Sequence, residues 1–364
     1  MKIVHLLPEL SEGGVELHVI ELSRELTRLG NESIVISHGG KLVTALKEDK
    51  VKHIKFDVCS KNPLTAPWRV YKLRELLREL NADLIHAHSR VPAWLSYLAN
   101  KRLHIPFVTT VHGYNSVSFY SKIMTLGDRI ICVSRGVKSY IEQHYHTPLE
   151  KIDVIYGGVD TEQFNPSNID SAFISQFQTQ YNLHEKFIVS IVGRITQLKD
   201  IETFIRAIQR LKKETPSIKA LIVGSVHEDK KDYFQTLKKL VQDLKLQDEI
   251  LFTGSQSQIE QIYALSDVVV SSSKKPESFG RSVAEAIAMN TPVVATNHGG
   301  VREIIIDGVN GYFFEVGDEV ELASKIIAAK NLAFDGYDYI SETFSLQKTV
   351  KRHLDVYRRA VENG

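Results

Sequence analysis

The chain is poor in cysteine: its 364 residues include only Cys59 and Cys132, which lie far apart in sequence. Two isolated cysteines supply neither a disulfide framework nor the paired spacing of a zinc site. Long apolar runs are also lacking, and none approaches the roughly 20 residues that a membrane-spanning helix requires. These absences argue against a disulfide scaffold and an integral membrane protein, and we expect both cysteines to be reduced.

An excess of charge of either sign is missing as well, since 45 lysines and arginines accompany 44 aspartates and glutamates. This balance gives no global field that would favour nucleic acid as a partner. The apolar residues 1–7 are too short for the hydrophobic region of a signal peptide, and no cleavage site follows them. We therefore expect a cytoplasmic protein that does not bind nucleic acid.

What the sequence does contain is a regular alternation of strand-length apolar runs and amphipathic helical stretches. The alternation begins at residues 2–7 and starts again at residues 187–192. Such alternation predicts a mostly parallel sheet with helices on both faces, and the length of the chain exceeds a usual single core. We predict an α/β protein with two Rossmann-like, doubly wound domains, whose ligands bind at the carboxyl ends of the strands.

The domain boundaries follow from changes in composition. We place the first domain at residues 1–165, a linker at 166–186, and the second domain at 187–340. The linker is rich in asparagine, serine and glutamine and has only weak periodicity. The terminal segment 341–364 is helical and long enough to pack back on the first domain.

Two glutamates mark the most informative stretch, residues 275–286. Glu277 precedes a helix that Ser278, Phe279 and Gly280 open, so it should lie beside free backbone N–H groups, which bind anions and hydroxyls. Glu285 lies two helical turns later, roughly 10–12 Å away. Carboxylates at this separation suit the two ends of a polyhydroxylated ligand with an anionic centre, in one cleft.

The alternative interpretation is that both glutamates are ordinary helix acids, one near the N-terminus and one on a solvated face. The neighbours of Glu285 disfavour it, because residues 283–288 are otherwise apolar nearly all round the helix. A charge in such surroundings has to be paired or functional.

A second candidate group follows the first strand of the second domain. Arg194 and Lys199 come just after Gly193 and before a helix that Asp200 is expected to cap. A guanidinium fork and a compact ammonium together suit a diphosphate, although two solvated surface cations are the alternative. Gly224 and Gly254 end further strands on the same rim, where backbone groups can meet a base or a ribose.

In the first domain, Gly13 and Gly14 separate the first strand from the first helix. Their spacing is not that of a dinucleotide fingerprint. They serve either a tight turn that needs positive φ or a close approach of backbone amides to a phosphate.

Histidines follow two strands of the first domain: His86 and His88 after one, and His112 after the next. No carboxylate or cysteine stands beside them at ligand spacing, so we predict no metal site. His112 is the stronger functional candidate because a glycine follows it at a strand end. His86 and His88 are equally well explained as structural histidines.

Taken together and in this order, these motifs resemble the retaining glycosyltransferases of family 4, which have GT-B architecture. The motifs are Gly13-Gly14, Gly193-Arg194 with Lys199, and Glu277 with Glu285 before the Gly299-Gly300 turn. The resemblance covers essentially the whole chain and is strongest between residues 193 and 311. It implies two domains facing each other across a cleft.

The resemblance also implies roles. Arg194 and Lys199 would hold the donor diphosphate, approached by the amides of Gly13 and Gly14. Glu285 would bind the ribose. Glu277 and the amides of Phe279 and Gly280 would hold hydroxyls of the donor sugar, which His112 would also reach. The family transfers sugars with retention and without a metal or other cofactor, so Glu277 would position the sugar and would not act as a nucleophile.

This sequence departs from the family pattern at two positions. Asp200 stands where glycine is common after the lysine, and the segment that begins at Gly224 lacks a second glycine. Residues 88–94, 112–114 and 127–129 are similar to lipopolysaccharide-core members of the family. The basic helix at residues 68–78 suits either an anionic membrane surface or a solvated face.

We therefore expect a metal-independent, retaining glycosyltransferase that uses a UDP- or GDP-sugar and a glycan or glycolipid acceptor in the synthesis of lipopolysaccharide or another envelope glycan. It would be cytoplasmic or peripheral at the inner membrane. The alternatives are a sugar-nucleotide 2-epimerase on the same architecture and a non-catalytic two-domain binding protein.

Overall fold

The structure, a computed structural model, describes residues 1–11 and 13–362. This part of the chain divides into two compact units. Unit 1 comprises Met1–Gly158 and Leu346–Gly364, and unit 2 comprises Val159–Ser345. Each unit has a parallel sheet of its own.

Unit 1 alternates strands and helices, as the sequence predicts. Its strands are β1 (Lys2–Leu6), β2 (Glu32–Ser37), β3 (Lys52–Lys55), β4 (Leu84–Ala87), β5 (Phe107–Val111), β6 (Arg129–Cys132) and β7 (Ile152–Val154). Its helices are α1 (Gly14–Arg28), α2 (Val43–Glu48), α3 (Ala66–Leu80), α4 (Arg90–Asn100), α5 (Arg135–His144) and α13 (Leu346–Glu362). The strands lie in the order β3-β2-β1-β4-β5-β6-β7.

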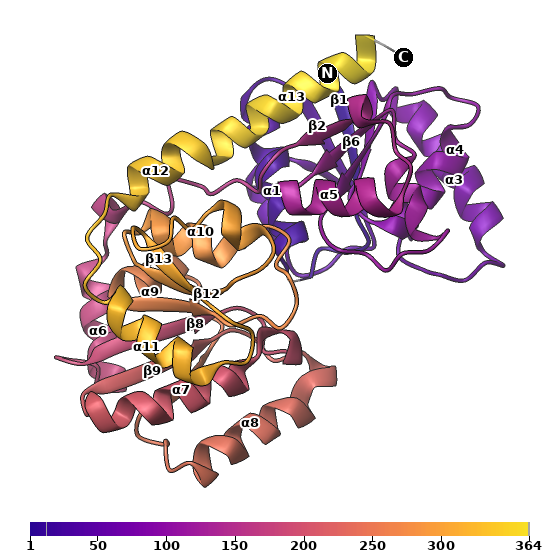
Figure 1. Cartoon of the computed structure of the whole chain (residues 1–364). Coiled ribbons are helices and arrows are strands. Elements are labelled where there is room, and N and C mark those ends of the chain that lie inside the picture. The colour runs from indigo at the N-terminus through magenta and orange to yellow at the C-terminus, as the bar shows by residue number, and fades with distance from the viewer. Residues whose placement is uncertain (12, 363–364) are drawn as a thin grey trace. The chain divides into compact units, whose positions relative to one another are not determined.

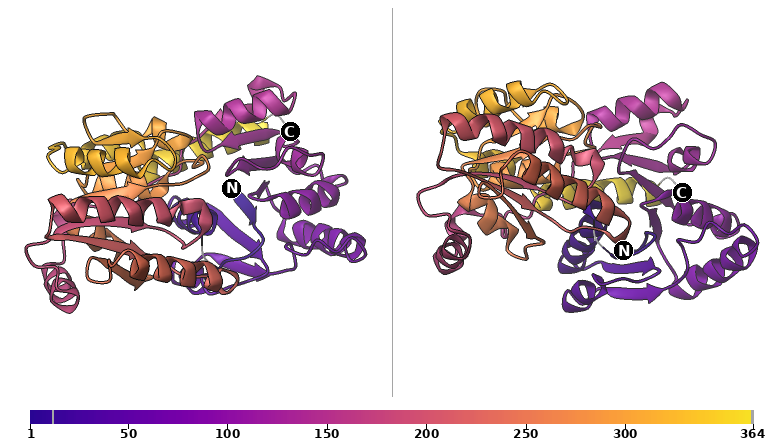
Figure 2. Two further views of the ribbon diagram at one scale, coloured as in Figure 1. Left: turned by 60° about the horizontal axis from the view of Figure 1, so that its bottom comes forward. Right: turned by 90° about the horizontal axis from the view of Figure 1, so that it is seen from below.

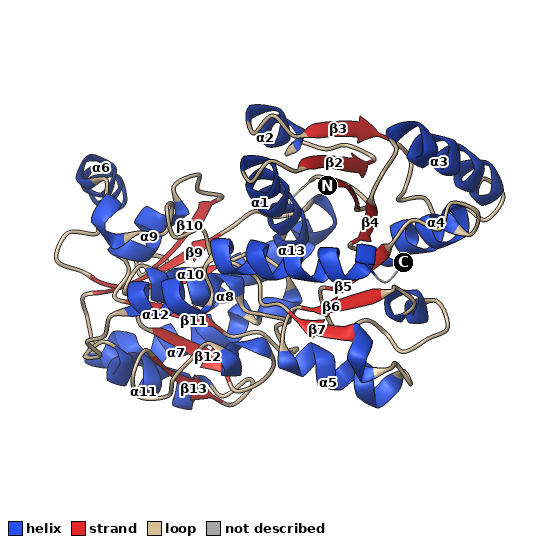
Figure 3. Cartoon of the chain, turned by 90° about the horizontal axis from the view of Figure 1, so that it is seen from above, coloured by secondary structure: helices blue, strands red, loops and turns tan. Residues whose placement is uncertain are grey.

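Helices cover both faces of the unit 1 sheet (Figure 3). Val4, Leu6 and Ile85 belong to the core that the sheet shares with α3, α4 and α5. Ile3 and Leu84 belong to the opposite core, which includes α1 and α13. Because strand side chains alternate between faces, His5 and His86, each two residues from one of these, also face α1 and α13.

Unit 2 repeats the plan. Its strands are β8 (Phe187–Val192), β9 (Ile218–Val223), β10 (Ile250–Gly254), β11 (Val268–Ser271), β12 (Val293–Thr296) and β13 (Gly311–Phe314). Its helices are α6 (Ser171–Tyr181), α7 (Ile201–Glu214), α8 (Lys231–Asp243), α9 (Ile259–Leu265), α10 (Arg281–Ala288), α11 (Glu319–Ala329) and α12 (Gly336–Thr343). The strand order is β10-β9-β8-β11-β12-β13.

The unit 2 sheet also lies between two helix layers, visible in the rose-to-orange part of Figure 1 and in both views of Figure 2. One core joins the strands to α7, α8 and α11. A second core on the other face includes α6 and α9. Two parallel, doubly wound sheets confirm the predicted fold class.

The division into units differs from the boundaries expected from the sequence. Residues 166–186, for which we predicted a linker, contain α6, and they belong to unit 2. The periodicity of α6 is weak because few of its side chains are buried: Phe177 is 5% exposed, and Leu183 lies just beyond the helix. Asp170 caps α6 through backbone N–H groups of Ala172 and Phe173, a start signal that the polar composition obscured.

The chain ends in α13, which belongs to unit 1. Leu346, Val350 and Tyr357 repeat at helical spacing and are at most 1% exposed. They join Ile3 and Val108 in the core beside α1. The last helix is therefore an integral layer of unit 1.

Candidate functional site

Each sheet reverses its strand order at one point, between β1 and β4 in unit 1 and between β8 and β11 in unit 2. In doubly wound folds, ligands bind at the carboxyl ends of the strands at such a point. In unit 2, Lys199 follows β8 and Glu277 follows β11. In unit 1, His88 follows β4. Candidate residues thus lie at the switch point of each unit.

Glycine ends three adjacent strands of unit 2. The N–H of Gly193 donates to Val223 O, and that of Gly224 donates to Gly254 O, each at 2.9 Å. Gly193 and Gly224 have φ values of 146° and 154°, and a Cβ on Gly224 would collide with the carbonyl oxygen of Gly193. Glycine is needed at Gly224 so that these strand ends lie against each other.

Lys199 and Glu277 form an ion pair at the switch point of unit 2. The Nζ of Lys199 lies 2.6 Å from Oε1 of Glu277, and the hydroxyl of Ser273 donates to the same oxygen. Both side chains keep about a quarter of their surface exposed, at 25% and 24%. The pair is therefore accessible to a ligand and held in place by protein groups.

The carboxylate form of Glu277 is favoured by this arrangement. Burial is the largest influence and raises the pKa of Glu277, but the Lys199 charge and the hydrogen bonds from Lys199 and Ser273 together outweigh it. The pKa consequently lies below its usual value of 4.5. Glu277 is an anion at neutral pH, which suits the acceptance of hydrogen bonds from hydroxyls.

The turn at Gly299 and Gly300 fixes the backbone of Glu277. The N–H of Gly300 donates to Glu277 O at 2.7 Å, and Glu277 and Gly299 form an isolated parallel bridge. Gly299 has a φ of 71°. A Cβ on Gly300 would stand 2.6 Å from the Cα of Phe279, so a side chain there would displace the Glu277 loop.

The same loop leads into α10. Gly280, at the N-cap position, has a φ of 101° and a ψ of 52°, a left-handed conformation that favours glycine. Phe279 is 7% exposed, and its ring lies 5.8 Å from that of Phe344. The buried ring anchors the segment, so that Ser278 and the first N–H groups of α10 follow directly from Glu277.

Glu285 is paired within unit 2, in line with the sequence argument that it must be paired or functional. Its Oε1 lies 2.6 Å from Nε of Arg281, and its Oε2 accepts a 3.0 Å hydrogen bond from the hydroxyl of Tyr263. The residue is 7% exposed. Burial, followed by the charge of Glu285, raises the pKa of Tyr263, so the hydroxyl remains a donor.

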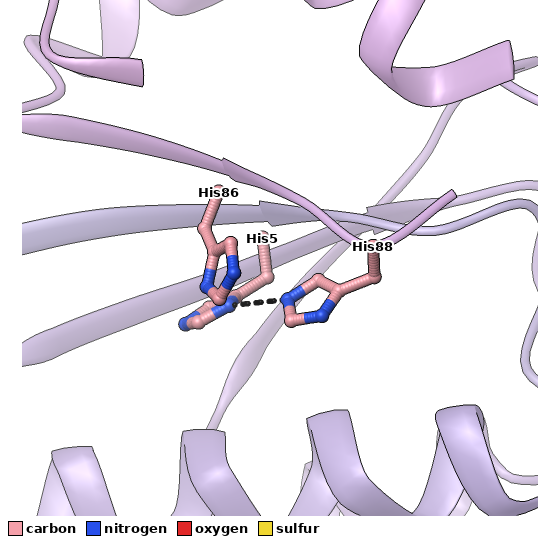
Figure 4. A group of neighbouring side chains, drawn as sticks. All are labelled: His5, His86 and His88. Carbon is pink, nitrogen blue, oxygen red and sulfur yellow. Dashed lines mark hydrogen bonds between the residues drawn. The ribbon is translucent and has the colours of Figure 1, made fainter. Parts of the chain in front are cut away.

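The switch point of unit 1 holds histidines instead of ion pairs. His5 and His86 are register partners on β1 and β4, and Figure 4 shows His88 beyond them, linked to His5. The Nδ1 of His5 lies 3.1 Å from Nε2 of His88. The Nδ1 of His88 lies in turn 3.0 Å from Nε2 of His112. These three imidazoles form one hydrogen-bonded chain.

Four further rings surround the three linked imidazoles: those of His18, His86, His353 and Tyr357. His18 on α1 packs edge-on against His112, with ring centroids 5.3 Å apart. His353 and Tyr357 on α13 pack beside His86 at 6.0 and 5.5 Å. His86 itself bonds to the hydroxyls of Tyr357 and Thr110, each at 2.7 Å.

The three linked histidines are neutral. Burial, reinforced by the charge of His353, lowers the pKa values of His5 and His112 to about 3. Burial and neighbouring histidines lower the pKa of His88 well below 6.5. Each ring therefore carries one N–H and one lone pair at neutral pH.

Two family models match this chain: Glycosyl transferases group 1 over residues 174–339, and Glycosyltransferase Family 4 over residues 12–163. The crystal structure of a glycosyltransferase from Rickettsia africae ESF-5 is 31% identical to the chain, with a TM-score of 0.91. That match covers 100% of this chain and 99% of the other. The chain belongs to the group 1 glycosyltransferases.

Two further relatives extend the likeness. N-acetyl-alpha-D-glucosaminyl L-malate synthase of Bacillus anthracis is 26% identical over 95% of this chain and 94% of its own length. Anabaena Alr3699/HepE, solved in complex with UDP-glucose, superimposes with a TM-score of 0.86 at 24% identity, covering 99% of this chain and 100% of that one. The family favours a transferase over the 2-epimerase and the non-catalytic binding protein that the sequence also allowed.

Two basic side chains of this group 1 glycosyltransferase differ in their surroundings. Lys199 is held by Glu277. Arg194 is exposed and has neither an ion pair nor a hydrogen bond within residues 1–11 and 13–362. The glycosyltransferase thus presents one fixed cation and one free to meet a ligand.

The expectation that Asp200 caps α7 was wrong. Asp200 occupies the N-cap position, but its side chain accepts no bond from the helix N–H groups. Its backbone is left-handed, with a φ of 48°, and the carboxylate accepts from Thr203 Oγ1 at 2.8 Å and pairs with Lys274 at 3.1 Å. A left-handed backbone explains why glycine is common here and why aspartate is tolerated.

In unit 1 of the glycosyltransferase, Gly13 is the N-cap residue of α1 and Gly14 is its first residue. A Cβ on Gly14 would meet no atom within 4 Å, so packing does not require glycine at that position. His112 lies one residue beyond β5 and is half-buried.

A metal site deserves separate consideration, because ligand atoms of His5, His86 and His88 lie within 4.8 Å of one another. Both ring nitrogens of His86 are bonded to hydroxyls, and both of His88 are bonded to other histidines. A divalent ion bound by these three histidines would have to displace these hydrogen bonds. The three histidines are also not accompanied by a carboxylate ligand. The absence of a metal centre therefore stays our prediction.

Several site residues escaped the sequence analysis. They are His5, His18, His353, Tyr357, Ser273, Tyr263 and Arg281. A signal existed for His5, a polar residue between the apolar residues Val4 and Leu6 of its strand, and for Arg281, which lies one helical turn before Glu285. His353 and Tyr357 are distant in sequence, and only tertiary packing brings them to the cluster.

Across residues 1–11 and 13–362, the helices of the glycosyltransferase are too short or too polar to cross a membrane.

Proposed function

We propose that this protein transfers a sugar from a nucleotide-diphosphate sugar, with retention of configuration, to a glycan or glycolipid acceptor of the cell envelope. The observation that carries the proposal is the Lys199–Glu277 pair at the switch point of unit 2, a fixed cation beside a fixed anion. A diphosphate sugar presents the matching groups, two phosphates and adjacent hydroxyls. The Anabaena relative solved with UDP-glucose supports this donor class.

The proposed roles in unit 2 follow the charges. Arg194 and Lys199 bind the diphosphate. Glu277 accepts hydrogen bonds from the donor sugar, and Ser278 with the N–H groups of Phe279 and Gly280 binds its other hydroxyls.

The nucleoside end of the donor is assigned to the remaining residues of the rim. Glu285 is held in place by Arg281 and Tyr263, and a carboxylate accepts hydrogen bonds from hydroxyls. We assign it to the ribose. The backbone of Gly224 and Gly254 is assigned to the ribose or the base, where the absence of side chains lets a ligand approach.

In unit 1 we assign Gly13 and Gly14 to the diphosphate and His112 to the donor sugar. The N-terminus of a helix suits an anion. His112 offers a neutral ring at a strand end, which can form a hydrogen bond with a hydroxyl without a net charge.

The chemistry that we propose needs no side-chain nucleophile. Breaking the bond between the sugar and the diphosphate builds negative charge on the leaving phosphate, which Lys199 and Arg194 stabilise. The acceptor's hydroxyl oxygen forms the new bond to the anomeric carbon on the face that the phosphate leaves, and the leaving phosphate oxygen takes the hydroxyl proton. Since Glu277 is engaged by Lys199 and Ser273, its role is to position the sugar, and the two cations take the place of a metal.

A peripheral membrane role is supported by an apolar pocket in unit 1, with a volume of about 380 Å³. Its lining is Ser60, Lys61, Asn62, Pro63, Ala66, Arg69, Val91, Trp94, Leu95, Leu98, Phe119 and Tyr120. Phe119 in this lining is 79% exposed, and Leu64 and Trp68, the sequence neighbours of the lining residues Pro63 and Arg69, are 87% and 60% exposed. An apolar patch of this kind marks a binding surface.

The segments that form this pocket are basic. Residues 58–74 and 88–127 contain eight lysines and arginines and no aspartate or glutamate: Lys61, Arg69, Lys72, Arg74, Arg90, Lys101, Arg102 and Lys122. The whole chain has a net charge of only +1. Exposed aromatic side chains with lysines suit the surface of an anionic bilayer. We propose that unit 1 meets such a membrane, where a lipid-linked acceptor would be found.

The donor is tested by measuring thermal stabilisation of the protein with a panel of UDP- and GDP-sugars. A true donor at about 100 times its dissociation constant adds roughly 2.7 kcal/mol to the free energy of unfolding. Transfer of a radiolabelled sugar, with the product anomer assigned by NMR and EDTA present, then tests turnover, retention and metal independence. No stabilisation by any nucleotide sugar would overturn the proposed donor class, and epimer formation from donor alone would replace transferase with epimerase.

The membrane role is tested by co-sedimentation with phosphatidylglycerol and phosphatidylcholine vesicles. We expect binding to the anionic vesicles only, and a loss of binding when Leu64 and Phe119 are both replaced by serine. Leu198→Ser, at a leucine of unit 2 that is 53% exposed, is the control. Equal binding of both vesicle types would refute an electrostatic contribution.

A further inference from the structure

The histidine chain of unit 1 has a property that its individual members lack. His5, His88 and His112 are linked by two hydrogen bonds, from Nδ1 of His5 to Nε2 of His88 and from Nδ1 of His88 to Nε2 of His112. Each neutral ring has one N–H, and each bond uses one N–H and one lone pair. The proton position on one ring therefore determines the positions on the other two.

Two arrangements satisfy both bonds. In the first, all three protons are on Nδ1, so His5 donates to His88, and His88 donates to His112. In the second, all three protons are on Nε2, and both bonds run the other way. The arrangements differ at the two ends, Nε2 of His5 and Nδ1 of His112.

The buried end favours the first arrangement. Nε2 of His5 is buried and has no hydrogen-bond partner in the described chain. The second arrangement would leave a buried N–H without an acceptor, which folded proteins rarely tolerate, whereas the first leaves only a lone pair without a donor.

His353 shows that the cluster tolerates such a lone pair. Its Nδ1 lies 2.8 Å from the carbonyl oxygen of Thr349, and a carbonyl only accepts, so the proton of neutral His353 is on Nδ1. Its Nε2 is then a buried lone pair, and it too has no partner among the described residues. His5 in the first arrangement is in the same condition.

We propose that His5 and His88 are positioning residues that hold His112 as its Nδ1–H tautomer, so that His112 acts as a hydrogen-bond donor toward the bound substrate. No hydrogen bond within the described residues occupies Nδ1 of His112. A ring fixed in this way donates to an oxygen of the sugar or of the phosphate without first reorienting its proton. The functional part of this inference rests on the proposed role of His112, but the tautomer does not.

The tautomer is measured on the full chain labelled with ¹⁵N-histidine, by two-dimensional NMR that detects the long-range imidazole couplings near neutral pH. We expect the Nδ1–H form for His5, His88, His112 and His353. An Nε2–H form of His112 would overturn the proposal, as would a charged ring.

Variants of His88 separate positioning from packing. His88→Leu removes the donor to His112, and we expect His112 to shift toward the Nε2–H form with a roughly tenfold loss of kcat/KM for the nucleotide sugar. His88→Asn places an amide N–H near the position of Nδ1, and we expect it to restore the Nδ1–H form and to bring the loss below about threefold. Equal tautomers of His112 in both variants would overturn the proposal.

His353→Leu is the matched control, since His353 is equally buried in the same cluster but lies outside the chain. We expect His112 to keep its tautomer in this variant. The wild-type spectrum decides the tautomer even if the His88→Leu variant does not fold.

If stoichiometric Zn²⁺ shifts the NMR signals of His5, His86 and His88 together, these residues form a metal site, and the proposed hydrogen-bonded chain of His5, His88 and His112 is wrong. If the wild-type protein has the expected tautomer but transfers no sugar, the proposed function is refuted, and the hydrogen-bonded histidine chain remains supported.

Discussion

The two switch points of this glycosyltransferase have the same backbone topology but differ in charge. In unit 2 the side chains are charged and paired, Lys199 with Glu277 and Arg281 with Glu285. In unit 1 the imidazoles are neutral, because burial lowers the pKa values of His5, His88 and His112 far enough that they lose their protons.

The difference follows from exposure and from partners. Lys199 and Glu277 keep about a quarter of their side-chain surface in solvent, and each has a partner of opposite charge. His5 has no solvent contact, and its neighbours are other histidines and Tyr357. Side chains stay ionised where they are paired and partly solvated. Titratable side chains that are buried without a partner of opposite charge become neutral. This contrast motivates our proposal that unit 2 binds the anionic part of the donor and that unit 1 forms uncharged hydrogen bonds with it.

The largest expected effect comes from removing the cations of unit 2. Arg194→Ala combined with Lys199→Ala should lower sugar transfer by about 10³-fold or more, because charge on the leaving phosphate loses its stabilisation. A radiolabelled-sugar assay measures the loss. Lys212→Ala is the control, since Lys212 also forms an ion pair, with Glu249 at 2.8 Å, but lies outside the switch point. Unaltered turnover in the double variant would remove the basis of the proposed function.

The next effect sharpens the role of the unit 2 anion. Glu277→Gln keeps the shape but loses the charge, and we expect turnover to fall about 10²-fold. The pKa of Glu277 is lowered by folding, so its contribution to stability is present above about pH 4.5 and is lost as the pH falls through the folded-state value. The difference in Tm between wild type and Glu277→Gln should accordingly shrink below about pH 4.5. A difference that does not change with pH would contradict the lowered pKa.

Unit 1 should show a different pH dependence. Its buried histidines have folded-state pKa values below 6.5, so the unfolded chain binds more protons and stability falls as the pH drops below about 6.5 toward the folded-state values. Each such histidine contributes about 1.4 kcal/mol per pH unit in that range. Urea unfolding at about pH 6 and about pH 5, between the unfolded and folded pKa values, measures the slope. His353→Leu should reduce the pH dependence of the free energy of unfolding by the contribution of about one proton. An unchanged slope would mean that His353 is charged in the folded protein.

The smallest effect is expected at Asp200. Asp200→Gly relieves a left-handed backbone but removes the bonds to Thr203 and Lys274. These contributions oppose each other, so the free energy of unfolding should change by less than about 1 kcal/mol. Thermal unfolding and the transfer assay measure the result. A large loss of activity would show that the Asp200 carboxylate takes part in the unit 2 site.

Much of the fold was predictable because it depends on local patterns. Apolar runs such as residues 187–192 have strand length, and the alternation with helices implies parallel sheets. Helix α6 was missed because most of its surface is exposed, so that few apolar positions mark its period. The positions of Lys199 and Glu277 after strands were also predictable, since the carboxyl ends of parallel strands meet at one edge.

The partners of the candidate residues were less predictable. The ion pair between Lys199 and Glu277 joins residues that are far apart in sequence and that only the adjacency of β8 and β11 brings together. Tyr263, which donates to Glu285, lies on α9, a different helix from α10. No local pattern records these contacts.

The sequence by itself determined the two doubly wound sheets, the glycines that end their strands, and the acids and bases that follow them. Only the tertiary structure decided that Lys199 and Glu277 form an ion pair, and that His5, His88 and His112 form a neutral hydrogen-bonded chain on the face of the sheet where α13 packs. The physical reason is that periodicity and turn chemistry act between near neighbours, whereas burial, pKa and hydrogen-bond partners are set by whichever distant segments the fold places alongside.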